Sequence, residues 1–288
     1  MKPASFRYYA PQNVDEAVAL LGEHAGEDGH ILAGGQSLVP MMALRLARPG
    51  ALIDINQIAS FAEIICESGW LAIGPCVRHA AFHKSVVDNP LGTLLSDVAK
   101  HIAHYPIRTR GTFCGSLAHA DPSSEWCLVA AALGAEIHAR NISATRIINA
   151  VDFFSGAMVT TLKPEEMIVS VHLPLLPADS VFGFAEFSRR AGDFAMAAAL
   201  TVYRLEDGRI ADARLAVGGA EEDPRRIAQA EAILNGALPG TEIFREASKA
   251  AAAAIDPITD VQTNSHFRRK LVHTICERAL ARTVSRDG

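Results

Sequence analysis

Two segments of the chain combine glycine with other small residues and with hydroxyl groups. The first covers residues 32–38 and reads Leu-Ala-Gly-Gly-Gln-Ser-Leu, and the second covers residues 110–122 and reads Arg-Gly-Thr-Phe-Cys-Gly-Ser-Leu-Ala-His-Ala-Asp-Pro. Glycine lets backbone N–H groups approach an anion closely, and its positive φ angles turn successive N–H groups to one side. Ser37 and Thr112 add hydroxyl donors. Together the segments have the chemistry to hold a diphosphate from two sides.

Each segment also has a simpler interpretation. A pair of glycines after a strand is usually a tight turn. The chain contains no G-x-G-x-x-G fingerprint, no Walker A motif, no H-E-x-x-H and no G-x-S-x-G, so no common nucleotide or catalytic signature decides the matter. Taken from the residues alone, the two segments are either turns or a site for an anionic cofactor.

Cysteine and histidine give little support for a metal. The five cysteines are Cys66, Cys76, Cys114, Cys127 and Cys276. They contain no C-x-x-C pair, whereas iron–sulfur and zinc sites use closely spaced ligands, so we expect reduced thiols and an organic redox cofactor. His101, His104 and His119 fall within 19 residues, but we interpret them as loop residues and predict no metal site.

Composition narrows the class of protein. The chain has 288 residues, 49% of them hydrophobic, and 27 basic against 32 acidic side chains, a net charge of −5. This balance predicts a globular protein and argues against a nucleic-acid partner, which usually requires a basic face. No apolar run reaches the roughly 18 residues of a membrane span, and residues 1–5 lack an apolar signal stretch, so the sequence predicts a cytoplasmic protein without a transmembrane segment.

The first glycine segment lies inside an expected small β/α unit. Asn13 and Glu16 are spaced as a helix-capping pair before an apolar stripe. A strand over residues 30–33 leads into the glycines, a helix over 38–46 follows, and a buried strand covers 51–55. Residues 1–55 therefore form one unit with the glycine turn in its middle.

The second glycine segment lies in an expected loop, residues 104–119, of a longer region. That region begins with a hairpin over 61–76, followed by helices over 77–87 and 94–103. After the loop we expect a helix over 124–133 and strands over 136–139 and 168–173. The prolines at 174 and 177 indicate a boundary.

Beyond the boundary the pattern changes to two strands and three helices. The strands, 197–204 and 209–217, are joined through Asp207-Gly208, a strong hairpin signal. The first helix is expected to be capped by Asp223, to have Pro224 at its first position and to end at Gly236. The other helices cover 242–255 and 266–281.

Six motifs, in order along the chain, match one protein family. They are A-G-G-x-S-L at 33–38, I-A-H-x-x-I-R-x-x-G-T at 102–112, G-S-L-A-H-A-D-P at 115–122, R-R-x-G-D-x-A at 189–195, a segment at 265–269 that resembles S-x-Y-R-R with Phe267 in place of tyrosine, and R-A-L at 278–280. The chain thus resembles, over essentially its whole length, the FAD-binding medium subunits of molybdenum hydroxylases. This family includes the carbon monoxide dehydrogenase medium subunit and the xanthine dehydrogenase FAD subunit.

The resemblance implies an α+β fold with two domains. Residues 1–177 would form the two-part FAD-binding fold of the vanillyl-alcohol oxidase (PCMH) type, with subdomains of about 1–55 and 56–177. Residues 178–288 would form a C-terminal domain of a small antiparallel sheet with helices. The implied FAD-binding residues are Leu32, Ala33, Gly34, Gly35, Gln36, Ser37, Leu38, Ile102, Thr112, Phe113, Cys114, Gly115, Ser116, Glu125 and Ile168.

The implied function is electron transfer without a catalytic side chain. The flavin would take electrons from the [2Fe-2S] clusters of a small partner subunit, which receives them from a molybdopterin-containing large subunit, and would pass them to an external acceptor. Two alternatives stay open: a self-sufficient FAD-dependent oxidoreductase of the same fold, which would oxidise its own substrate, and an FAD-free interaction subunit, which would be colourless.

Two positions depart from the family pattern. Cys114 stands where the family's T-I-G-G loop has glycine, so a positive φ angle there would be strained. Glu186 stands where some relatives carry a lysine near the flavin. Cys114 supports the FAD-free alternative, and Glu186 leaves the tuning of the flavin potential open.

Overall fold

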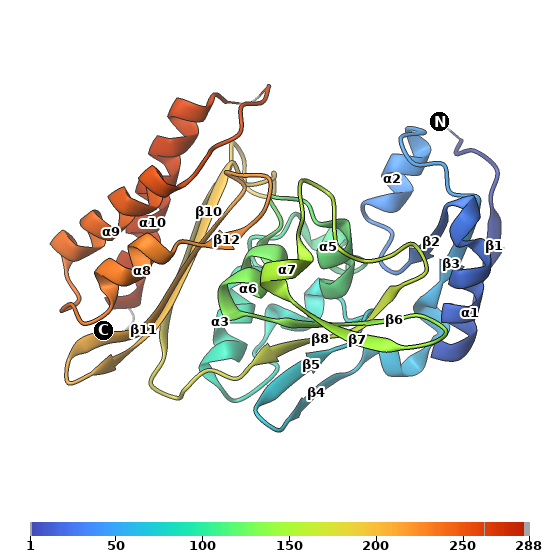
Figure 1. The fold of residues 1–288 in the computed structure, drawn as a ribbon, viewed down its shortest axis with the longest axis horizontal. Helices are drawn as coiled ribbons and strands as arrows, with labels where there is room; N and C mark the ends of the chain where they lie inside the picture. The colour runs from blue at the N-terminus through green and yellow to red at the C-terminus, as the bar shows by residue number, and fades with distance from the viewer. Residues whose placement is uncertain (1, 262, 285–288) are drawn as a thin grey trace.

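The computed structural model describes residues 2–261 and 263–284, which form three units, each with its own sheet (Figure 1). In Figure 1 the N-terminal unit lies on the right, the five-stranded sheet with its helices in the middle, and the C-terminal unit on the left. No helix of the described residues is long and apolar enough to cross a membrane. The predicted α+β class is confirmed.

The N-terminal unit is a three-stranded parallel sheet, order β1-β3-β2, with one long helix. Its elements are β1 (Arg7–Tyr9), α1 (Val14–His24), β2 (Gly29–Leu32), α2 (Leu38–Ala43) and β3 (Ala51–Asp54). Asn13 begins α1 by accepting a hydrogen bond from the N–H of Glu16 at 2.9 Å. A complete capping box would also have the Glu16 carboxylate accept from the N–H of Asn13. Here the carboxylate accepts instead from the N–H of Gln12.

The middle unit is an antiparallel sheet of order β4-β5-β8-β6-β7. Its strands are β4 (Ile64–Glu67), β5 (Trp70–Ile73), β6 (Glu136–Arg140), β7 (Thr145–Asn149) and β8 (Met167–Pro174). Its helices are α3 (Pro90–Ala99), α4 (Tyr105–Arg108), α5 (Phe113–His119), α6 (Glu125–Leu133) and α7 (Ala150–Phe153). Helices α3, α5, α6 and α7 lie on one face of this sheet (Figure 1).

The C-terminal unit is a four-stranded antiparallel sheet, order β12-β11-β10-β9, covered by helices. Its elements are β9 (Val181–Phe187), β10 (Ala197–Glu206), β11 (Arg209–Gly218), β12 (Arg225–Arg226), α8 (Ala228–Leu234), α9 (Thr241–Ala254) and α10 (Ser265–Val284). Asp207 and Gly208 both have positive φ angles at the tip of the β10–β11 hairpin, as the sequence predicts.

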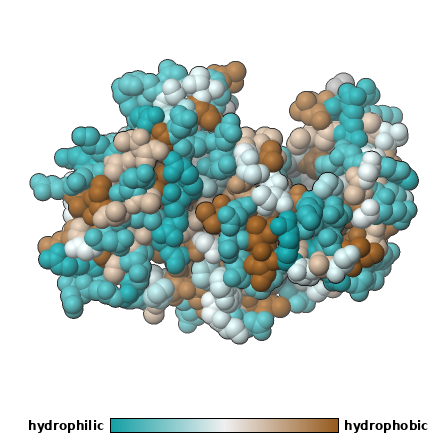
Figure 2. Space-filling view, viewed as in Figure 1, coloured by the Kyte–Doolittle hydropathy of each residue, from teal (hydrophilic) through white to brown (hydrophobic). Residues whose placement is uncertain are grey.

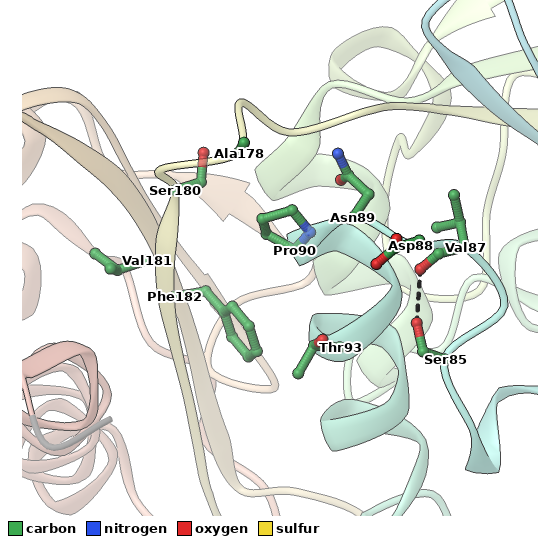
Figure 3. A pocket seen from close by; sticks show the side chains of 10 residues that line it. All are labelled: Ser85, Val87, Asp88, Asn89, Pro90, Thr93, Ala178, Ser180, Val181 and Phe182. Atoms are coloured by element: carbon green, nitrogen blue, oxygen red, sulfur yellow. Dashed lines mark hydrogen bonds between the residues drawn. The ribbon is translucent and has the colours of Figure 1, made fainter. Parts of the chain in front are cut away.

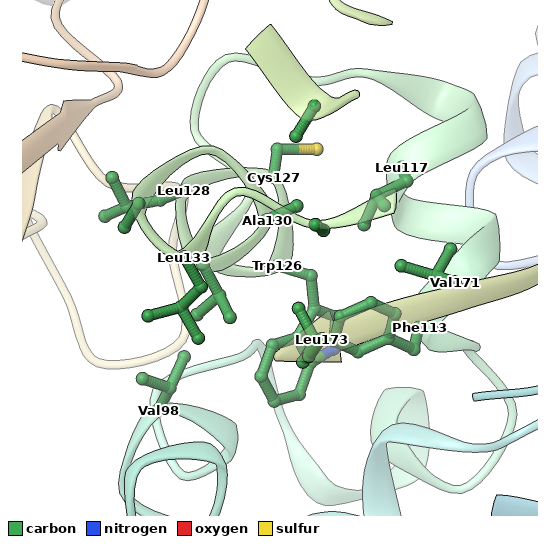
Figure 4. Packing of buried hydrophobic residues seen from close by; sticks show 14 of the residues in the cluster. Val98, Phe113, Leu117, Trp126, Cys127, Leu128, Ala130, Leu133, Val171 and Leu173 are labelled. Atoms are coloured by element: carbon green, nitrogen blue, oxygen red, sulfur yellow. The ribbon is translucent and has the colours of Figure 1, made fainter. Parts of the chain in front are cut away.

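The middle unit is organised around aromatic side chains that are fully buried. Trp126 packs against Phe113, with ring centroids 4.9 Å apart (Figure 4). It also packs against Phe82 at 5.2 Å, and its indole N–H donates to Nδ1 of His79 at 2.9 Å. Leu200 and other residues of the C-terminal sheet belong to the same apolar cluster. The core therefore holds the middle and C-terminal units together.

Three expected elements around the second glycine segment are wrong. Residues 77–87 contain only a short 3-10 helix, His79–His83, because Arg78 forms a β-bridge with Thr112. Helix α3 begins at Pro90 rather than Leu94, since Asn89 accepts from the N–H of Leu91 and caps it. Residues 104–119 are not a loop but contain α4 and α5.

The first C-terminal helix also begins later than expected. Asp223 does not cap it, because its carboxylate accepts the N–H of Gly156 at 2.9 Å. The chain then adds the short strand β12, and α8 starts at Ala228. Strands β1, β7 and β9 were not predicted from the sequence.

Candidate functional site

The two glycine segments, 78 residues apart at their first positions (32 and 110), touch each other in the folded chain. A Cβ atom on Gly34 would lie 2.4 Å from the carbonyl oxygen of Arg110 and 2.7 Å from Cα of Gly111. These distances are shorter than any real Cβ contact, so residue 34 must be glycine for the loops to meet. We call residues 32–38 the first glycine loop and residues 110–116 the second.

The first glycine loop offers unpaired backbone donors. Gly35 has a φ of +69°, which L side chains rarely adopt. Within the described part of the chain, the N–H groups of Gly35, Gln36 and Ser37 donate to no other group. The carbonyl of Gly35 accepts from Val39 at 3.1 Å and thereby leads into α2. A left-handed turn with free N–H groups is a backbone arrangement that binds anions.

Arg78 and Asn56 brace the two loops, although neither was a candidate from the sequence. The Asn56 amide donates to the carbonyl of Ala33 at 2.8 Å, and the Arg78 guanidinium donates to Oδ1 of Asn56 at 2.5 Å. The same guanidinium donates to the carbonyl of Arg110 in the second loop. Asn56 lies in a short 3-10 helix, Ile55–Gln57, and Arg78 immediately precedes another, His79–His83. Neither residue belongs to a sequence motif, so only the tertiary structure reveals them.

The second glycine loop is the start of α5. Oγ1 of Thr112 accepts the N–H of Gly115 at 3.1 Å, so the threonine hydroxyl acts as a helix cap, and the N–H of Gly115 is already paired. The ring of Phe113 is fully buried against Phe82. The second loop therefore presents mainly backbone to the first loop.

Cys114 fits its helical position without strain. It does not have a positive φ angle, and its side chain is buried in the core, where Sγ lies 3.5 Å from the carbonyl of Ile73. Burial raises the pKa of the Cys114 thiol, so the thiol is protonated at neutral pH. The backbone strain that a positive φ angle would impose on a cysteine is therefore absent at residue 114.

A pocket of about 380 Å³ opens beside the braced loops. It is lined by Leu32, Ala33, Gly34, Gly35, Gln36, Val39, Pro40, Asp54, Asn56 and Arg110. Five of the predicted site residues are in this lining, whereas Ser37, Leu38 and the residues of α5 are not. The molecular surface is hollowed between the N-terminal and C-terminal units, above α5 (Figures 1 and 2).

The remaining predicted residues lie outside this pocket. Ile102 is buried, and its carbonyl accepts from the Arg108 guanidinium at 2.7 Å. Ile168 is buried on β8, paired with Ala139 of β6. Glu125 is the first residue of α6. The pocket thus joins the first glycine loop to Arg110, and Ile102 and Ile168 belong to the adjoining core.

A second glycine contact connects two more of the sequence motifs. Gly192 has a φ of +85°, and a Cβ atom there would lie 2.6 Å from the ring of His104. The loop between β9 and β10 therefore packs directly against the start of α4. His101 contacts a different residue, with Nδ1 3.2 Å from the Glu186 carboxylate. Among the described residues, His101, His104 and His119 do not converge as ligands.

Glu125 and Glu186 form an acidic region between the middle and C-terminal units. Burial, and then the charge of Glu186, raise the pKa of Glu125 to about 8. One carboxylate oxygen of Glu186 is buried without a hydrogen-bond partner among the described residues. The other neighbour of Glu186 is His101, whose Nδ1 lies 3.2 Å from the Glu186 carboxylate.

The raised pKa of Glu125 predicts a pH-dependent stability. The carboxyl of an unfolded chain titrates near 4.3, so in the folded protein Glu125 stays protonated at higher pH, and the free energy of unfolding falls as pH rises from about 4 to about 8. We expect Glu125→Gln to remove this loss of stability. The melting temperature of the variant minus that of the unmodified FAD-free chain should therefore increase from about pH 4 to about pH 8 and stay constant at higher pH. Parallel melting curves from pH 5 to 9 would contradict this, and Glu246→Gln, at an exposed position of α9, is the control.

A larger depression, about 590 Å³, lies between the start of α3 and β9 (Figure 3). Its lining includes Asn89, Pro90 and Phe182. The Asn89 amide is already used, because it donates to the carbonyl of Leu176 at 2.8 Å and its oxygen accepts two backbone N–H groups. The Asn89 side chain therefore offers no free donor to this depression.

Comparison with known proteins gives the same assignment along the whole chain. The family model described as the FAD binding domain in molybdopterin dehydrogenase matches residues 4–176, and the model of the CO dehydrogenase flavoprotein C-terminal domain matches residues 182–283. The chain is 36% identical over 286 residues to the nicotine 6-hydroxylase medium subunit of Paenarthrobacter nicotinovorans, covering 99% of this chain and 100% of the relative. It is 38% identical over 287 residues to the 6-hydroxypseudooxynicotine dehydrogenase complex subunit alpha of the same organism, covering 99% and 97%.

A solved structure agrees. A chain of carbon monoxide dehydrogenase from Hydrogenophaga pseudoflava superposes with a TM-score of 0.94 at 33% identity, covering 99% of both chains. With two facing glycine loops between a β/α unit and an antiparallel sheet, these matches define a flavin-binding oxidoreductase subunit. The chain belongs to the family of FAD-binding subunits of molybdenum hydroxylases, and its cofactor is FAD. The family predicted from the six motifs is confirmed.

Proposed function

We propose that the two glycine loops hold the diphosphate of FAD. The observation that carries this proposal is the contact of Gly34 with Arg110, beside which the N–H groups of Gly35, Gln36 and Ser37 are unpaired. A side chain at residue 34 would fill the space that joins the loops, and Arg110 lies in the lining of the pocket. The residues proposed to contact FAD are Leu32, Ala33, Gly34, Gly35, Gln36, Ser37, Leu38, Ile102, Thr112, Phe113, Cys114, Gly115, Ser116, Glu125 and Ile168.

The side chains of Phe113 and Cys114 are in the core, so their proposed contribution is made by the main chain. Ile102 and Ile168 would bring apolar atoms to the cofactor, and Glu125 a hydrogen-bonding carboxyl group. We propose residues 1–177 as the FAD-binding domain, with subdomains of about 1–55 and 56–177, and residues 178–288 as the C-terminal domain. The segment between β8 and β9 contains no regular element, which supports a boundary there.

FAD, when bound, supplies redox chemistry in one- and two-electron steps. This chain's part is to bind and orient it, since its pocket contains no nucleophile–base pair. We propose that electrons reach the subunit from the [2Fe-2S] clusters of a small partner subunit, which is supplied by a molybdopterin-containing large subunit, and leave to an external acceptor. The absence of a clustered cysteine set in the sequence supports metal centres on other chains. We further propose a cytoplasmic location.

Purification of the tagged chain from its native host tests this function. We expect the complex to contain iron and molybdenum, and denaturation to release FAD rather than FMN, because the two loops suit a diphosphate. The isolated FAD-loaded chain should be reduced by dithionite but not by an organic substrate such as nicotine. Substrate reduction of the isolated chain would instead identify a self-sufficient flavoenzyme, and a colourless chain that takes up no added FAD would identify an interaction subunit.

A further inference from the structure

A group of three potential metal ligands lies on the face of the five-stranded sheet opposite the helices. Ile137 and Ala139 of β6 and Val171 of β8 point into the apolar core. Because side chains alternate along a strand, Glu136, His138 and His172 lie on the other face. Glu136 is the direct partner of His172 across the β6–β8 ladder.

The three side chains converge closely enough to share one ion. One ligand atom from each of Glu136, His138 and His172 lies within 4.8 Å of the others. The two imidazole rings are stacked, with centroids 3.9 Å apart and planes inclined by 23°. Because each nitrogen lone pair lies in the plane of its ring, binding of one ion by both rings would turn them out of this stack. A carboxylate oxygen of Glu136 lies 3.7 Å from Nε2 of His138, which is too long for a hydrogen bond.

One of these ligand atoms lacks a partner. Nε2 of His138 is buried, and no described residue offers it a hydrogen bond. A buried polar atom without a hydrogen-bond partner is energetically costly, and a bound ion would satisfy Nε2 of His138. The Ser170 hydroxyl lies 3.0 Å from Nε2 of His172. Up to His138 the ladder keeps a regular register, and it shifts between His138 and Ala139.

We propose that Glu136, His138 and His172 bind a divalent first-row transition metal ion. Two imidazole nitrogens and one carboxylate oxygen are a ligand set that such ions accept, with the remaining positions open to solvent. The ion would connect β6 to β8 on the outer face of the sheet. The site is separate from the glycine loops and shares no residue with their pocket. It therefore adds to the flavin function and does not depend on it.

Zinc binding by the full FAD-loaded chain tests the proposal. After treatment with a chelator, calorimetric titration with zinc should show one tight site per chain. Saturation at about 100 times the dissociation constant should raise the melting temperature by roughly 5 °C or more, because the ion binds only the folded state. Cobalt should give the visible absorption of an ion with mixed nitrogen and oxygen ligands.

Matched substitutions locate the ion. His138→Gln, His172→Gln and Glu136→Gln should each weaken zinc binding by about 100-fold or more, since even indirect partners of a metal contribute about 10- to 100-fold. His266→Gln, at an exposed position of α10, should leave the affinity unchanged. Equal FAD content and equal metal-free melting temperatures would show that the variants fold. Absence of a tight site, or zinc affinity that survives all three substitutions, would overturn the proposal.

Discussion

Gly34→Ala should lose FAD binding by about 100-fold or more while the chain still folds. The added Cβ would lie 2.4 Å from the carbonyl oxygen of Arg110, and neither atom can move away without separating the two glycine loops. Hydrogen bonds to a charged group such as a diphosphate contribute about 1.5–3 kcal/mol each, and a loss of about 2.8 kcal/mol weakens binding about 100-fold. The measurement is the dissociation constant for FAD by quenching of flavin fluorescence, together with the flavin content of the purified protein.

The same change at Gly22 is the control. Gly22 is an exposed residue of α1, and a Cβ there meets nothing within 4 Å. Gly22→Ala should therefore keep full FAD affinity and, as an alanine in a helix, slightly stabilise the chain. Normal FAD affinity in Gly34→Ala would show that the diphosphate is not held where the loops meet.

Arg78→Met should weaken FAD binding by roughly 10- to 100-fold and lower the melting temperature by about 4–8 °C. The guanidinium donates to Oδ1 of Asn56, which holds the first glycine loop, and to the carbonyl of Arg110 in the second. Hydrogen bonds from a charged group contribute about 1.5–3 kcal/mol each, and methionine preserves the apolar stem but not these bonds. FAD affinity and thermal unfolding with and without FAD measure the two effects separately.

Arg209→Met is the matched control for this substitution. Arg209 also donates to a main-chain carbonyl, that of Gly236 at 2.8 Å, but it lies in the C-terminal unit. We expect a small change in melting temperature and none in FAD affinity. If Arg78→Met lowered stability without changing FAD affinity, the brace would be structural only, and the two loops would be positioned by the rest of the fold.

The family assignment and several helices and turns can be predicted from the sequence alone. The six motifs occur in family order and identify an FAD-binding subunit, and the family models agree with that assignment. Local chemistry also places several elements: Asn13 begins α1, and Asp207-Gly208 turns between β10 and β11. Such signals act between residues close in the chain, so they can be recognised without knowing the fold.

The other features depend on contacts between distant segments. Asp223 has the residue type of a helix cap, but its carboxylate binds the N–H of Gly156, 67 residues away. Residues 77–87 have the pattern of a helix, but Arg78 pairs with Thr112 and the helix is reduced to one short turn. In both cases a tertiary hydrogen bond outweighs a weak local preference.

The functional sites show the same division between sequence and structure. The sequence alone identifies the glycines, whereas the tertiary structure reveals why residue 34 must be one: Arg110 occupies the space of its side chain. Likewise, Glu136 and His138 are separated from His172 by more than 30 residues, and only the register of β6 against β8 brings them together. Spacing along a chain says nothing about strand register, which depends on how the whole sheet buries its apolar face.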